Sequence, residues 1–442
     1  MKTAAALAVL LLATTATADP LTLRQALEEA LARNPRLVAS GAGIAAARAR
    51  SAQARAAWFP RAEVSAVSAQ SNNPVFVFGS LLEQGRFGPE HFDPSFLNDP
   101  EPLRNDRLAL NVRYTLFDQL RRLGSTRQTR NAAAQAEHGD DELRQRLRLE
   151  TLRAYFGVAL AGQRHEVAQA AVRAGESQAG AIRDRMQQGL VVESDLLSAD
   201  VQLARYRQQQ VEAEGELAIA QAALATLLQR PMHGAVEIAS PIADPAPLTL
   251  SLDAAVTRGL ASRGDVKAAR LAAENARIEI RSARGSLLPR VDAWASWGAS
   301  GATFRHSNSD RTFSLTATVD LFDAARYARI AEARAGSTAA VAAGDLVEDA
   351  AAMEIVTAFH RLRAAEQRVG LAGRSAAQAE AAARIIHDRY ANGLTTITEQ
   401  LRAGTAVVTA QLDLLAARYD RIVGRAELLR AMGELHNVEE FE

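Results

Sequence analysis

The chain of 442 residues contains no cysteine, carries no excess of either charge and has few aromatic residues. The lack of cysteine excludes disulfides, thiolate metal sites and a lipid-modified N-terminal cysteine. Lysine plus arginine and aspartate plus glutamate each number 51, so the formal net charge is zero and no nucleic-acid partner is expected. Aromatic residues make up only 5 %, which is low for an enzyme with a compact core.

The sequence contains no motif that is typical of a catalytic or metal site. The eight histidines are not spaced as metal ligands, and the chain has no G-x-S-x-G motif, no phosphate-binding loop and no cysteine–histidine set. We therefore expect no enzymatic activity, no metal and no cofactor.

The first 18 residues have the pattern of a secretory signal peptide. Lys2 is followed by a short apolar stretch at 4–13, and Ala16-Thr17-Ala18 fits a cleavage site. About ten apolar residues are too few to span a bilayer, which argues against a membrane anchor. The rest of the chain has no long uncharged apolar run, so no transmembrane helix is expected after it.

Internal similarity indicates that the chain holds two copies of one unit. The segment around Pro60 (WFPR) recurs around Pro289 (LLPR) at an offset of 229 residues, and Leu-Phe-Asp at 116–118 recurs at 321–323 at an offset of 205. The matches keep the same order in both halves, so they predict a duplication rather than chance similarity. The second copy is then shorter between its two matched segments.

Proline placement divides the copies further. Four prolines fall within 231–247, which we interpret as a linker between repeat 1 (19–230) and repeat 2 (248–442). Residues 103–230 and 290–442 contain no proline. Because proline breaks helix interiors, both tracts can hold very long helices. The predicted helices lie at about 36–58, 119–188, 194–230, 265–287, 323–392 and 398–436.

Two segments alternate apolar and polar residues with a period of two, at 107–117 and 312–322. Each is about 11 residues long, which suits a tilted transmembrane strand and equally a half-buried strand of a soluble sheet. A weaker strand precedes each, and the polar segment 299–311 is expected to form the loop of the second hairpin. The predicted strands lie at about 61–72, 107–118, 290–303 and 311–322.

Four strands alone cannot stand in lipid. An open sheet leaves two edges of unpaired backbone groups, and each such group costs several kcal/mol in hydrocarbon. Closure therefore requires other chains: two copies would give eight strands with a filled interior, and three would give twelve with room for a lumen. The polar faces of the strands suit a wet lumen and favour three copies.

Each copy also contains a turn between two long helices. Gly189 and Gly393 are each followed by a short segment and a residue of capping type, Ser194 or Thr398. Asp195 and Glu399 then favour the first turn of the next helix through its dipole. Each copy is thus expected to form a helical hairpin whose end lies far from the strands.

At this point the pattern resembles the TolC family of outer-membrane efflux proteins over essentially the whole mature chain. The resemblance rests on LTLRQALEEALARNP near the start, WFPR and LLPR before the strands, Leu-Phe-Asp after them, and the turn segments RMQQGLVVESDLLSAD and RYANGLTTITEQLRAG. It implies an α+β membrane protein: a homotrimer with a 12-stranded barrel in the outer-membrane lipid, four strands from each chain, continued by a periplasmic helical coiled-coil tunnel.

The resemblance also implies a function. Such a protein is the passive outer-membrane duct of a tripartite efflux or type I secretion system. It is opened by a periplasmic adaptor and served by an inner-membrane pump of the RND, ABC or MFS class.

Residues near the two turns acquire roles only through this resemblance. Asp195 and Tyr390 match a hydrogen-bonded pair that closes the tunnel, and Glu399 matches a lumen-facing acid. Arg402 stands where a second acid can lie and Thr395 where an arginine can lie, so a double acidic ring is not expected; Asp195 and Glu399 can also be simple helix-start residues. The expected adaptor contacts are Gly189, Leu190, Val191, Ser194, Gly393, Leu394, Thr395 and Thr398.

Two alternatives stay open from the sequence alone. A soluble periplasmic coiled-coil adaptor would explain the helices but would leave the strands without a role. The phenylalanine-rich segment 73–102 either folds over the mouth of the pore or packs on itself as a surface loop, and we favour the second.

Overall fold

The computed structural model describes residues 20–232, 236–239, 249–436 and 441. The expected signal peptide (1–18) and parts of the expected linker (231–247) lie outside the described residues. The chain divides into two compact units. We call Met1–Ala42, His138–Lys267 and Leu346–Glu442 the helical unit, and Gly43–Glu137 and Ala268–Asp345 the strand unit.

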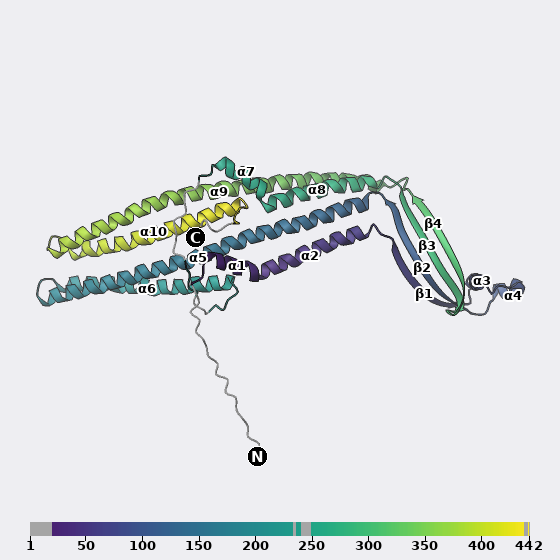
Figure 1. The fold of residues 1–442 in the computed structure, drawn as a ribbon, viewed down its shortest axis with the longest axis horizontal. Coiled ribbons are helices and arrows are strands. Elements are labelled where there is room, and N and C mark those ends of the chain that lie inside the picture. Colours follow the sequence, from purple (N-terminus) through teal and green to yellow (C-terminus); the bar gives the residue numbers. More distant parts are fainter. Residues whose placement is uncertain (1–19, 233–235, 240–248, 437–440, 442) are drawn as a thin grey trace, which may run out of the picture. The chain divides into compact units, whose positions relative to one another are not determined.

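The strand unit is built on one antiparallel sheet with strand order β1-β2-β3-β4 (Figure 1). The strands are β1 (Arg61–Ser71), β2 (Leu103–Asp118), β3 (Arg290–Thr303) and β4 (His306–Thr318). β2 and β3 pair with each other although they are far apart in the sequence, and β1 and β4 form the two edges. In the described part of the chain, each edge strand is paired on one side only.

The register sorts the side chains of the sheet onto two faces. The apolar face carries exposed large residues: Val64, Leu108, Leu110, Trp297, Phe313 and Leu315. The polar face carries Asn105, Arg107, Asn111, Ser296, Ser300, Asp310, Thr312, Ser314 and Thr316. The exposure of large apolar side chains is unusual for a sheet in water, where such a face would be covered.

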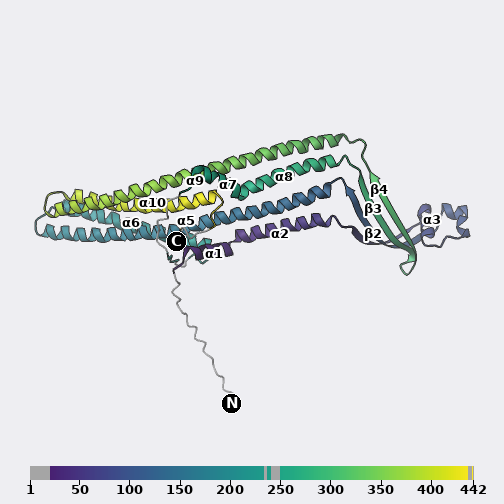
Figure 2. The ribbon, with the colours of Figure 1, turned by 45° about the horizontal axis from the view of Figure 1, so that its top comes forward.

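Long helices enter the helical unit from both halves of the chain. They are α5 (Arg121–Gln187), α6 (Glu193–Leu227), α9 (Ala324–Ala391) and α10 (Ile397–Ala431), and both views show α5–α6 and α9–α10 as hairpins (Figure 2). α2 (Pro35–Ala56) and α8 (Gly264–Gly285) are shorter. No helix in the described part of the chain combines the length and the hydropathy that a bilayer span requires.

Two short helices that the sequence analysis did not predict complete the core of the helical unit. α1 (Leu23–Arg33) begins at a capping box, in which Thr22 accepts from the backbone of Gln25, and it buries Leu23 and Leu27 against α5. α7 (Leu252–Ser262) is packed near Ile355, Phe359 and Met432. The hydroxyl of Tyr155 donates to the carbonyl of Leu21 at 2.9 Å, so a buried polar group is satisfied where α1 begins.

The segment between β1 and β2 is folded rather than extended. It contains α3 (Pro74–Glu83), the 3₁₀ helix η1 (Pro89–Phe92) and α4 (Pro94–Asn98). Phe87 packs edge-on against Phe78 and Phe92, with ring centroids 4.9 and 5.1 Å apart, so the aromatic residues pack on one another as favoured above. Asn105 on the polar face bonds to Glu83 and Gln84 at the end of α3, each at 3.0 Å.

Several element bounds differ from those predicted. β4 begins at His306 rather than near 311 and ends at Thr318 rather than 322, so most of the expected loop 299–311 is strand. Residues 306–310 are polar on both faces of the strand, so the apolar–polar alternation on which the prediction relied is absent there. β2 likewise begins at Leu103 rather than near 107. α10 ends at Ala431 rather than near 436. Two residues later Gly433 has a φ of +70°, a conformation that does not continue a helix.

Candidate functional site

The two helix turns at the end of the helical unit have the same backbone geometry. Gly189 and Gly393 each have a φ of +73°, a conformation that glycine adopts without strain. Leu190 N–H donates to the Arg185 carbonyl at 2.9 Å, and Leu394 N–H donates to the Arg389 carbonyl at 2.8 Å. Both turns therefore close the preceding helix in the manner of a Schellman motif.

The helices that follow these turns begin earlier than predicted. α6 has Val192 at its N-cap with no side-chain hydrogen bond, and α10 has Thr396, whose hydroxyl accepts from the backbone of Glu399 at 3.4 Å. Ser194 and Thr398 therefore lie inside the first helical turn, and their assignment as capping residues was wrong. Glu399 is the third residue of α10, where its charge favours the helix start.

The predicted hydrogen bond between Asp195 and Tyr390 is not present within the chain. The Tyr390 hydroxyl is buried and has no hydrogen-bond partner among the described residues. Its ring packs in an apolar cluster with Ile182, Leu203 and Ile397, and the guanidinium of Arg185 lies 5.3 Å from the ring centroid. Apolar packing and a cation–π contact therefore hold this tyrosine in place. The family resemblance did not indicate the contact between Arg185 and Tyr390.

Glu399 and Arg402 contact each other. Arg402 Nη1 lies 3.0 Å from Glu399 Oε1 across one helical turn, and both side chains are largely exposed. The acid that the resemblance places in the lumen thus has a counter-charge on its own helix. Exposed salt bridges contribute about 0–1 kcal/mol to the free energy of unfolding. The pair therefore affects the local charge at the start of α10 more than the stability of the fold.

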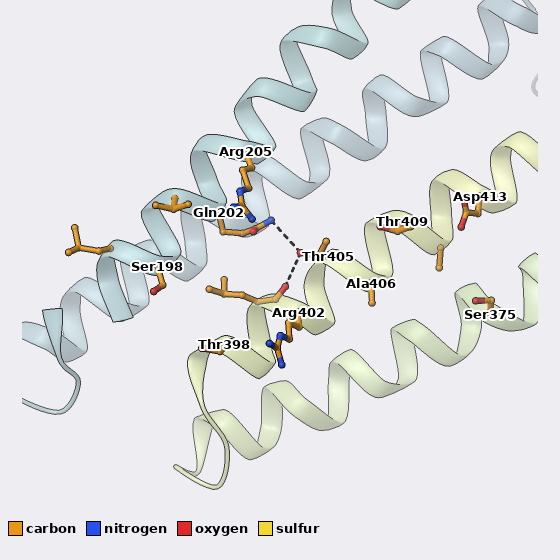
Figure 3. A pocket seen from close by; sticks show the side chains of 14 residues that line it. Ser198, Gln202, Arg205, Ser375, Thr398, Arg402, Thr405, Ala406, Thr409 and Asp413 are labelled. Atoms are coloured by element: carbon orange, nitrogen blue, oxygen red, sulfur yellow. Dashed lines mark hydrogen bonds between the residues drawn. The ribbon is translucent and has the colours of Figure 1, made fainter. Parts of the chain in front are cut away.

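An open cavity of about 880 Å³ lies between α6 and α10 (Figure 3). Gln202 on α6 donates to the Thr405 hydroxyl on α10 at 3.3 Å, and Arg205 and Arg402 approach from the two helices. The lining residues are Leu197, Ser198, Val201, Gln202, Arg205, Ser375, Thr398, Leu401, Arg402, Thr405, Ala406, Thr409, Ala410 and Asp413. Thr398 and Arg402 were expected near a functional surface, but the sequence carries no signal for this cavity, which depends on how α6 and α10 pack.

Equivalent apolar side chains project from the two turns. Leu190 is 68 % exposed and Leu394 is 66 % exposed, whereas Val191 is partly buried against the cluster around Tyr390. Each hairpin end thus carries one exposed leucine at a matching position. Isolated apolar residues need no explanation, but their equivalent placement suits contact with another protein.

A band of exposed apolar residues marks the end of the sheet where it meets the helices of its own unit. Its members are Trp58, Phe59, Leu287, Leu288, Leu321 and Phe322. Arg122 is packed between Trp58 and Tyr114, with its guanidinium 4.7 and 5.7 Å from the two rings, and it bonds to Asp118 at 3.0 Å. Aromatic and leucine side chains with nearby arginines are typical of a membrane–water interface.

Comparison with known proteins identifies the family. A family model described as outer membrane efflux protein matches residues 26–229 and 256–434, which is most of the chain. Protein CyaE of Bordetella pertussis is 29 % identical over 439 residues, covering 94 % of this chain and 85 % of its own.

Solved structures share the fold. A membrane protein from Pseudomonas aeruginosa superimposes with a TM-score of 0.81 at 21 % identity, covering 93 % of this chain and 90 % of its own. VceC from Vibrio cholerae gives 0.79 at 21 %, covering 93 % and 96 %. The MtrE outer membrane channel of Neisseria gonorrhoeae, in its open state, gives 0.77 at 18 %, covering 93 % and 89 %. The chain therefore belongs to the outer membrane efflux protein family and is an outer-membrane channel for efflux or secretion.

Proposed function

We propose that three copies of this chain form one closed barrel of 12 strands in the outer membrane, with the helices forming a periplasmic tunnel. The observation that carries the proposal is a four-stranded sheet with two unpaired edges and an uncovered apolar face. In hydrocarbon the unpaired backbone groups of an edge would cost on the order of tens of kcal/mol. Pairing β1 of one copy with β4 of the next removes every edge.

The two faces of the sheet support this arrangement. Phe313 is 77 % exposed and Leu315 is 62 % exposed on the apolar face, which suits contact with lipid tails. Thr312, Ser314 and Thr316 alternate with them on the polar face, which suits a water-filled lumen. Three copies rather than two leave space for that lumen, because an eight-stranded barrel is filled by its own side chains.

The hairpin ends are the proposed place of contact with a periplasmic adaptor, and an inner-membrane pump supplies the substrate. Leu190 and Leu394 offer apolar contacts, and the neighbouring tip residues are Gly189, Val191, Ser194, Gly393, Thr395 and Thr398. Asp195, Tyr390, Glu399 and Arg402 remain the proposed gate residues. Of these four residues, only Glu399 and Arg402 contact each other in the described part of the chain, so neighbouring copies are proposed to supply the gate contacts of Asp195 and Tyr390.

Disulfide cross-linking tests the strand pairing directly, because the chain has no cysteine of its own. Glu63→Cys on β1 is combined in turn with Thr312→Cys, Ser314→Cys or Thr316→Cys on β4, all on the polar face. Oxidation in outer membranes is expected to yield covalent dimers and trimers for at least one pair. The control pair Glu63→Cys and Asn111→Cys, which are opposite each other within one chain, should remain monomeric. Monomers from all three combinations would contradict the barrel.

A further inference from the structure

A second cavity, of about 840 Å³, lies in the strand unit where the polar face of the sheet meets the ends of α2 and α5. It is lined by Ala56, Ala57, Phe59, Pro60, Arg61, Arg113, Tyr114, Thr115, Asp118, Gln119, Arg121, Arg122, Arg290, Asp292, Ala293 and Trp294. Five of these residues are arginines and two are aspartates, so the lining carries an excess of positive charge. The chain as a whole has no net charge, which makes this local excess notable.

Only part of that positive charge is neutralised within the chain. Arg122 pairs with Asp118 at 3.0 Å, and Arg290 pairs with Asp292 at 2.8 Å. Within the described part of the chain, Arg61, Arg113 and Arg121 form no ion pair or side-chain hydrogen bond. Three guanidinium groups therefore face one cavity without a counter-charge.

Two of these arginines lie directly opposite each other in the sheet. Arg61 on β1 and Arg113 on β2 are register partners and share the polar face. Like charges at such a position repel and destabilise the pair of strands. Glu63, the next acid on this face of β1, pairs in register with Asn111 and makes no ion pair in the described structure. The repulsion between the two arginines is therefore not relieved by the chain itself.

A third donor continues the row on the next strand. Trp294 on β3 is the register partner of Arg113, and its buried indole Nε1 has no hydrogen-bond acceptor among the residues that the structure describes. Neighbouring strands are about 4.8 Å apart, so the row Arg61–Arg113–Trp294 extends over roughly 10 Å. An unpaired indole N–H beside two unpaired guanidinium groups is an arrangement of donors that lacks only an acceptor.

We propose that the row Arg61–Arg113–Trp294, with Arg121 beside it, binds polyvalent oxyanions, that is, phosphate or carboxylate groups of solutes in the lumen. Guanidinium groups bind both groups through paired, charge-assisted hydrogen bonds. The proposal rests on the proposed function, since three copies around a lumen would place nine uncompensated arginines in one ring. A ring of this sign concentrates anions and excludes cations.

Binding is tested on the full chain purified in detergent, with inorganic pyrophosphate and citrate as probes at low ionic strength. Both anions are expected to bind in titration calorimetry and to raise the melting temperature of the wild type. Arg61→Gln combined with Arg113→Gln should weaken binding by about tenfold or more. Without ligand this double variant should melt at the same or a higher temperature, because the repulsion is gone.

Arg311→Gln is the matched control, because Arg311 is an exposed arginine of β4 on the opposite, apolar face. It should bind both anions like the wild type. Equal binding by the double variant and the wild type, or no binding of either anion by the wild type, would overturn the proposal. Binding of pyrophosphate without binding of citrate would overturn the carboxylate part of the proposal and support the phosphate part.

Ion selectivity in planar bilayers separates this proposal from the proposed function. The double variant should conduct like the wild type but shift its reversal potential in a potassium chloride gradient toward cation selectivity. Anion binding without any channel conductance would overturn the duct and leave the site standing. Conductance with no effect of the double substitution on binding or selectivity would overturn the site and leave the duct standing.

Discussion

Arg263 and Glu354 form an ion pair in the helical unit, with 2.6 Å between the guanidinium Nη1 and the carboxylate Oε2. The Arg263 side chain is only 5 % exposed, and it also contacts Asp265 and the carbonyl of Ala431. Arg430 on α10 bonds to the same Glu354 and to Glu142 on α5. One group of charges thus connects the end of α7 with three long helices.

Removing Arg263 should destabilise the helical unit. Arg263→Ala leaves the Asp265 carboxylate without its ion-pair partner and Glu354 with Arg430 alone, and the loss of one partner of a buried pair costs about 3–5 kcal/mol. Because Glu354 is 37 % exposed, we expect a smaller loss of about 2–3 kcal/mol, seen as a lower melting temperature in detergent. Arg164→Ala, which breaks only an exposed pair with Glu216, should change little. Equal effects of the two substitutions would contradict the assigned role.

Acid should weaken the contact between α1 and the segment after α6. A hydrogen bond from Arg230 lowers the pKa of Glu29 below its usual 4.5, and this effect outweighs the opposing effect of burial. The contribution of this pair to stability is therefore fully present above about pH 4.5 and is lost as the pH falls through the lowered pKa. Glu29→Gln should make the melting temperature less dependent on pH below 5. A pH profile identical to that of the wild type would argue against the pair.

The turn glycines are expected to be needed for their backbone conformation. Gly393→Ala places a Cβ at a φ of +73°, which costs about 1 kcal/mol and should open the turn locally. Hydrogen exchange of the amides at 390–396 is expected to become faster. Gly370→Ala is the control, because Gly370 lies within α9 with no atom near its added Cβ, and there alanine favours the helix. Unchanged exchange in Gly393→Ala would show that the turn tolerates a side chain.

Tyr390→Phe distinguishes packing from gating. The hydroxyl has no hydrogen-bond partner in the part of the chain that the structure describes, so its removal should change the free energy of unfolding by less than about 0.5 kcal/mol. If the hydroxyl contacts a neighbouring copy, conductance of the closed channel should rise while the stability of each chain stays the same. Arg185→Ala removes the cation–π contact and serves as the comparison. Unchanged conductance in Tyr390→Phe would remove Tyr390 from the proposed gate.

The strands and long helices could be predicted because their signals are local. The alternation through Leu108, Leu110 and Val112 and the proline-free tracts are properties of consecutive residues. The outer parts of β2 and β4 were missed because both of their faces are polar, so that only pairing with a neighbouring strand shows them to be strands. The N-cap of α10 was misplaced by two residues because Thr396 and Thr398 are equally good capping types, and only the backbone geometry selects between them.

The candidate sites depend on register and packing, which the sequence does not state. Arg61, Arg113 and Trp294 come from three strands, and only the pairing of β1, β2 and β3 brings them into one row. The predicted contact between Asp195 and Tyr390 came from resemblance, and it failed within the chain because the tyrosine packs against Ile182 and Arg185 instead. Side-chain contacts between helices depend on which helices pack together and on which helical turns face each other.

The sheet is proposed to be completed by strands from other copies, and the mass of the assembled protein tests this completion. The protein is extracted from outer membranes in mild detergent and measured by native mass spectrometry after the detergent is removed in the gas phase. A single species of three times the mass of the mature chain is predicted. A species with the mass of one chain, released from the membrane without detergent, would contradict the account.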